Sequence, residues 1–150
     1  MATLRGGERL AERLREIAKL VARPATLRVG FLENATYPDG TPVAMIAAIQ
    51  DFGAPGAGIP PRPFFRNMIR DKQKEWPPAI AGLLKANGFD AAKALELTGQ
   101  AIAGQLRQSI VDTNEPPLAQ STIRRKGSAK PLVDTGHMLN SVEVRVKTGE

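Results

Sequence analysis

The pattern of apolar residues predicts a helix at the start of the chain. Between residues 8 and 22, apolar side chains recur at every third or fourth position, at Leu10, Leu14, Ile17, Ala18 and Val21. This spacing places them on one face of an amphipathic helix. Because Pro24 cannot continue a helix, residues 1–23 are expected to form an N-terminal amphipathic helical segment. Residues 26–32 (TLRVGFL) then alternate between apolar and polar side chains, which is typical of a strand.

The middle of the chain is divided by glycine and proline. Residues 43–52 have the pattern of a short apolar helix. The next segment, residues 53–63 (GAPGAGIPPRP), is too rich in both residues for a helix or a central strand, so it is predicted to be a loop of defined, extended shape. A helical pattern occupies residues 64–88 and is interrupted at Pro77 and Pro78. These prolines suit a kink or the first turn of a new helix.

The last third of the chain contains the clearest helical pattern and a second strand. Residues 90–111 carry an apolar stripe, and Asp90 is suited to cap the start of this helix. Its small residues, among them Gly99 and Gly104, would let another backbone approach closely. Residues 142–147 (VEVRVK) alternate again and are expected to pair with the first strand, which would close the domain.

These elements together predict one α+β domain over residues 1–150, with a small, mostly antiparallel sheet packed by four to five helices. The chain has 150 residues, which is enough for a single hydrophobic core. It contains no cysteine and one histidine, so disulfides and zinc sites built on thiolates are excluded. We expect no cofactor, no metal and no membrane contact, and synthesis in a cytoplasm.

The net charge of +6 permits contact with nucleic acid or with an acidic protein surface. The basic residues gather in a predicted loop over residues 113–131, at Arg124, Arg125, Lys126 and Lys130. Several cations on one flexible surface suit the phosphates of DNA, although no aromatic residue is interleaved for base stacking. A solvated loop is an equally good interpretation. A small basic DNA-binding protein is therefore the alternative function.

The strongest resemblance to a catalytic motif is residues 132–136 (LVDTG), since aspartic proteases carry Asp-Thr-Gly after an apolar strand. Their chemistry needs two carboxylates that share a proton, so one copy per chain suffices only in a symmetric dimer. The motif lies close to the end of the chain. The chain is also rich in helix, whereas the aspartic protease fold is nearly all strand. A dimeric protease that uses Asp134 is accordingly a remote alternative. In the structural interpretation, Asp134 or Thr135 caps a short helical turn over residues 136–141.

Several segments in this order resemble the tail-completion proteins of long-tailed bacteriophages, also called neck, head–tail joining or virion morphogenesis proteins. The residues that carry the resemblance are Val29–Phe31 (VGF), Val43–Gly53 (VAMIAAIQDFG), Ile59–Arg66 (IPPRPFFR), Pro116–Leu118, Ser121, Thr122, Arg125–Gly127, Pro131–Gly136 (PLVDTG), Leu139 and Ser141. They cover most of residues 28–146. Asp51 stands where the family more often has glutamate, and either acid can do the same local work.

The resemblance implies a structural virion protein without catalytic activity, made in the host bacterial cytoplasm. It would form a ring, commonly hexameric, that joins the tail to the head beside head-closure and tail-terminator or tail-tube proteins, with DNA passing through the channel. The preordered loop before residue 66 would present Arg62, Phe64 and Phe65, together with Asp51, to a neighbouring subunit. We expect one phenylalanine to point inward. Arg62 is expected either to bind Asp51 or to lie in the interface, and a buried Asp51–Arg62 ion pair is the favoured arrangement. The basic loop would contact the channel or a partner ring.

Overall fold

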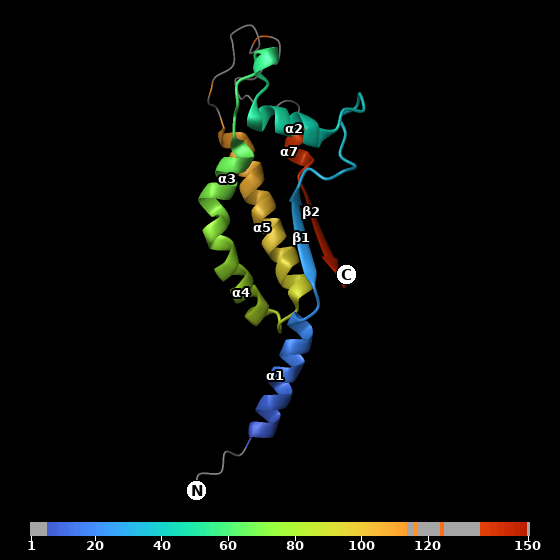
Figure 1. Cartoon of the computed structure of the whole chain (residues 1–150), viewed down its shortest axis with the longest axis vertical. Coiled ribbons are helices and arrows are strands. Elements are labelled where there is room, and N and C mark those ends of the chain that lie inside the picture. The colour runs from blue at the N-terminus through green and yellow to red at the C-terminus, as the bar shows by residue number, and fades with distance from the viewer. Residues whose placement is uncertain (1–5, 114–115, 117–123, 125–135, 150) are drawn as a thin grey trace.

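A computed structural model of the chain describes residues 6–113, 116, 124 and 136–149. Its centre is a long helix, α5, which lies between a two-stranded sheet on one side and the α3–α4 arm on the other (Figure 1). The elements run in the order α1 (Gly7–Val21), β1 (Ala25–Gly30), α2 (Val43–Phe52), η1 (Pro55–Ala57), α3 (Phe64–Lys72), η2 (Gln73–Glu75), α4 (Trp76–Ala86), α5 (Ala91–Asp112), α7 (His137–Asn140) and β2 (Glu143–Thr148). The fold is α+β, as the sequence predicts.

The first and last strands pair with each other and so close the domain, which confirms the expected pairing. They are antiparallel, with a register that runs from Ala25 opposite Thr148 to Gly30 opposite Glu143. Each strand lies within one or two residues of its expected bounds. The start and the end of the chain therefore contribute equally to one ribbon, whose inner face covers α5.

Helix α5 is suited to a central position because its small residues let the sheet come close. Its start is capped as predicted, since the Asp90 carboxylate accepts a hydrogen bond from the Lys93 backbone N–H at 3.0 Å. A Cβ at Gly99 would clash with the Val144 side chain and would lie 2.7 Å from Leu27 Cδ1. Side chains of the sheet, rather than another backbone, make the close approach there. Gly104 has no heavy atom within 4 Å of such a Cβ.

The arm beside α5 is a pair of helices rather than one. A short 3-10 turn, η2, separates α3 from α4, and Pro77 and Pro78 occupy the first turn of α4. A missing backbone N–H is tolerated at that position. The indole Nε1 of Trp76 donates to Gln105 Oε1 at 2.9 Å, which ties the start of α4 to α5. Of the predicted alternatives, the start of a new helix is therefore the correct one.

The core lies at the end of α5 that is close to α2, α3 and α7. Its buried apolar residues are Val43, Ala47, Phe64, Met68, Ile102, Ala103, Leu106, Ile110, Met138 and Val142. Aromatic residues are scarce in this chain, and Phe64, Phe65 and Phe31 form one cluster with ring centroids 6.3–6.4 Å apart. Short helix α7, with Met138 buried, confirms the helical turn expected over residues 136–141.

Candidate assembly interface

The carboxylate of Asp51 joins the end of α2 to the start of α3. Helix α2 buries every fourth residue, at Val43, Ala47 and Asp51, so its last turn carries the carboxylate inward. Although only 3% of Asp51 is exposed, its oxygens are satisfied. Oδ1 accepts from the backbone N–H groups of Phe65 at 2.9 Å and Arg66 at 3.3 Å. The residue preceding α3, Pro63, offers no side-chain cap, so Asp51 caps this helix from another element.

Arg66, and not Arg62, is the ion-pair partner of Asp51, so the expected pair is wrong. The Arg66 Nε donates to Asp51 Oδ2 at 2.6 Å, and its Nη2 donates to the Asp51 backbone oxygen at 2.7 Å. The reason is helical geometry, because side chains on α3 lean toward its N-terminus and so toward the end of α2. Arg62 precedes the helix and points elsewhere.

Arg62 is buried in the subunit and ties the proline-rich loop to the chain beyond α5. It is 5% exposed. Its Nε donates to the Pro116 backbone oxygen at 3.0 Å, and Nη1 lies 3.5 Å from Gln50 Oε1. Burial lowers the pKa of the Arg62 guanidinium from its usual value. Arg62 thus acts as an internal anchor.

The proline-rich loop folds back on itself instead of running extended. Ala54 and Ile59 exchange backbone hydrogen bonds of 2.8 and 3.1 Å around the 3-10 turn η1. Gly53 turns the chain out of α2 with φ 77°, and a Cβ there would lie 2.8 Å from the Pro61 nitrogen. Only glycine combines this backbone conformation with so close an approach. The loop is therefore a closed, stiff turn held at its base.

The exposed part of the α2–α3 junction is the aromatic ring of Phe52, with the guanidinium group of Arg66 packed against its face. Phe52 is 64% exposed, and the Arg66 guanidinium carbon lies 4.4 Å from the centroid of its ring. Met45, 49% exposed, lies two helical turns earlier on α2. We call Met45, Phe52 and Arg66 the α2 surface. It has the composition of an interaction site, where aromatic residues and arginine are enriched.

The four interface residues expected from the sequence mostly lie beneath this surface. Asp51, Arg62 and Phe64 are buried, and Phe65 is half-buried. The inward phenylalanine is Phe64, which confirms that expectation. The sequence contained a signal for the exposed pair of Phe52 and Arg66. In the segments that carry the family resemblance, these residues directly follow Asp51 and Phe65.

A second exposed apolar surface lies on α1. No residue of this 15-residue helix is buried. Its apolar residues reach solvent at Leu10 (59% exposed), Leu14 (56%), Leu20 (42%) and Val21 (46%). We call this row the α1 stripe. An exposed apolar stripe of this kind indicates an interaction surface.

The remaining candidate residues lie mostly outside the described part of the chain. Of the basic cluster, Arg124 is described and exposed, whereas Arg125, Lys126 and Lys130 lie outside it, as do Asp134 and Thr135. His137 has a structural contact, with its Nε2 2.8 Å from the Thr36 backbone oxygen. Within the described ranges no group of three or more His, Asp or Glu residues is placed to hold a metal ion. No described helix is both long and apolar enough to span a membrane.

Comparisons of the chain with known protein families, with curated proteins and with solved structures find no match.

Proposed function

We propose that this chain is a structural subunit of a tailed bacteriophage particle, a ring-forming tail-completion or neck protein that joins the tail to the head. The observation that carries the proposal is the pair of exposed apolar surfaces at opposite ends of the molecule. The α1 stripe lies on the helix that projects from one end, and the α2 surface lies at the other (Figure 1). A subunit with different contact surfaces at its two ends is suited to stand between different neighbours.

The α2 surface is prepared for binding before any partner arrives. Asp51 and Arg66 fix the angle between α2 and α3, and the short turn after Gly53 is closed by its own hydrogen bonds. Side chains that are already ordered lose little conformational entropy on docking. This rigidity supports a role in assembly, and the sequence resemblance supports the phage neck as the place.

In the proposed particle the protein forms a hexameric ring around the channel through which DNA passes. Its partners are copies of itself, a head-closure protein, and a tail-terminator or tail-tube protein. The chain is made in the host cytoplasm and ends in the virion, and it works without a catalytic site or a cofactor. The basic residues from Arg124 to Lys130 face the channel or a partner ring in this proposal.

The test is electron microscopy of lysates from a phage that carries a nonsense mutation in this gene. We expect DNA-filled heads beside unattached tails, and joined particles when the unaltered gene is supplied in trans. Phe52→Asp should fail to restore joining, because it places a charge on the α2 surface. Leu97→Asp, which changes another exposed apolar residue, should restore it. Normally joined particles from the nonsense mutant would refute the proposal.

A further inference from the structure

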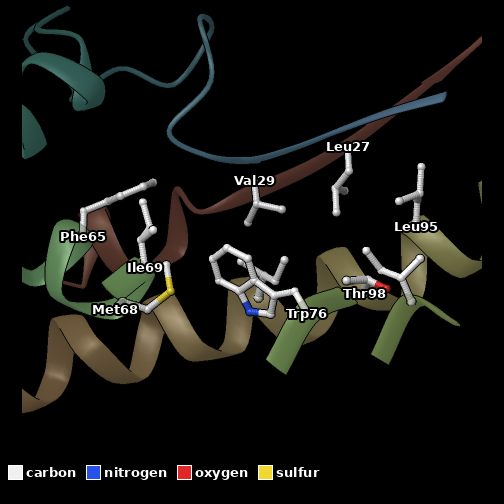
Figure 2. Close-up of a pocket in the computed structure, with 10 residues that line it drawn as sticks. Leu27, Val29, Phe65, Met68, Ile69, Trp76, Leu95 and Thr98 are labelled. Atoms are coloured by element: carbon white, nitrogen blue, oxygen red, sulfur yellow. The ribbon is translucent and has the colours of Figure 1, made fainter. Parts of the chain in front are cut away.

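An apolar cavity of about 320 Å³ opens between β1, the α3–α4 arm and α5 (Figure 2). It is lined by Leu27, Val29, Phe65, Met68, Ile69, Trp76, Ile80, Leu95, Thr98 and Ile102. Most of these side chains are half-buried, so the described residues leave a groove of apolar surface open to solvent. We call it the β1–α4 groove. Its lining resembles a binding site for an apolar helix face, with almost no polar group to direct a small polar ligand.

The same chain carries an amphipathic helix, α1, none of whose residues is buried by the described part of the chain. Helix α1 has a row of exposed leucines along one face and charged residues, among them Glu12 and Lys19, on the opposite face. The apolar residues at positions 10, 14, 17 and 21 have the spacing with which an amphipathic helix binds a hydrophobic groove. The helix and the β1–α4 groove are thus chemically complementary surfaces of one molecule.

The connection to β1 favours the groove of a neighbouring copy over that of the same chain. Figure 1 shows α1 running away from the body, beyond the start of β1. Only Ala22, Arg23 and Pro24 separate the two elements, and Pro24 has a fixed φ. To reach its own groove, the helix would have to reverse direction within these residues. Short, stiff connections of this kind favour exchange of an element between subunits.

We propose that α1 of each subunit docks into the β1–α4 groove of the next copy in the ring. The inference rests on the proposed function and supplies its subunit contact. Because helix and groove are different surfaces, each copy can donate to one neighbour and accept from another, and such a head-to-tail contact generates a ring when its rotation closes. Every subunit then donates one helix and accepts another.

The size of the contact explains how such a ring would assemble. A helix of 15 residues is only about 22 Å long and about 10 Å wide, and it presents one of its faces to a groove. Stable pairs of proteins bury roughly 800 Å² on each partner. One docked helix therefore holds an isolated pair weakly, whereas a closed ring gives every subunit two such contacts. Self-association should accordingly be concentration-dependent.

The experiment uses the absence of cysteine from the chain to report on contacts between copies. Two single-cysteine variants of the full chain, Leu14→Cys and Ile80→Cys, are mixed and oxidised mildly over a range of protein concentrations. We expect a disulfide-linked heterodimer whose yield rises with concentration. The control pairs Ile80→Cys with Glu12→Cys, on the opposite face of α1, and should give at least tenfold less. Thermal melting confirms that each variant is folded.

Other outcomes would overturn the inference. A heterodimer yield no higher than that of the Glu12→Cys control would show that the stripe does not enter a neighbour's groove. In the double variant Leu14→Cys/Ile80→Cys, an intrachain disulfide that persists on dilution would show that α1 folds back onto its own groove. If the particles still need this protein but contain rings insensitive to Leu14→Asp, the docking is wrong and the proposed function stands. If the nonsense mutant joins heads and tails normally, the function fails whatever the cross-linking shows.

Discussion

Replacing Asp51 with alanine should destabilise the fold far more than the loss of an ordinary ion pair. The substitution removes the cap of α3, the partner of Arg66, and the link between α2 and α3 in one step. The backbone N–H groups of Phe65 and Arg66 lose their acceptor in a place that water reaches poorly, since Asp51 is 3% exposed. Buried donors without partners are costly.

The expected loss in the free energy of unfolding for Asp51→Ala follows from these separate contributions. Loss of a helix cap costs about 0.5–2 kcal/mol, and a buried donor left unsatisfied costs about 1–3 kcal/mol. The ionic contribution of Arg66 is reduced by solvent, because its side chain is 49% exposed. We expect a total of about 3 kcal/mol, which corresponds to a fall in melting temperature of roughly 6–12 °C for a chain of this length. Asp51→Asn keeps one acceptor oxygen and should lose about half as much.

The assay is urea denaturation followed by circular dichroism, with thermal melting as a second measurement. Asp71→Ala is the matched control, because Asp71 also pairs with an arginine of α3, at 2.7 Å, but is 57% exposed. It should leave the free energy of unfolding almost unchanged. Equal losses for Asp51→Ala and Asp71→Ala would refute the reasoning, since they would show that burial and capping contribute nothing.

Further substitutions test other parts of the fold. Gly99→Ala should destabilise by about 1–3 kcal/mol in urea denaturation, because its Cβ meets the sheet, whereas Gly104→Ala on the same helix should stabilise by up to about 1 kcal/mol; equal effects would contradict the close packing. The pKa of Glu33 lies below its ordinary 4.5 because its own backbone N–H and then Arg145 donate to it. Its stabilisation is therefore present above pH 4.5 and lost as pH falls through the folded-state pKa, and Arg145→Gln should raise the NMR titration midpoint. Neutralising Arg124, Arg125, Lys126 and Lys130 together should abolish salt-dependent DNA binding if the basic loop contacts DNA; unchanged binding would place that contact elsewhere.

The helices and strands could be predicted from the sequence because each has a strong local signal. Apolar spacing defined α1 and α5, alternation defined the two strands, and Asp90 marked the start of α5. The pairing of the first and last strands was also predictable, since the domain offers no other long alternating segments. These features depend on neighbours in the sequence or on simple counting.

The contacts of the site could not be predicted in the same way. Asp51 had two arginines within reach, and the choice of Arg66 depends on which residues enter the first turn of α3 and how their side chains lean. The fold-back of the proline-rich loop depends on a bridge between Ala54 and Ile59 that composition does not specify. Likewise, the amphipathic pattern of α1 indicated that one face is covered, but not that its own domain leaves it exposed. Each of these features depends on how the helices and loops are placed relative to one another in three dimensions.

The junction between α1 and β1 has a mechanical consequence. Helix α1 extends beyond the start of β1 and away from the body (Figure 1), so tension transmitted through α1 pulls β1 lengthwise past β2. All the residue pairs from Ala25–Thr148 to Gly30–Glu143 share that load at once, instead of opening one after another. A pull across the ribbon would instead load the residue pairs between β1 and β2 one at a time. The strands would then separate at a far smaller force. The β1–β2 ribbon thus resists tension along its projecting helix better than tension across its strands.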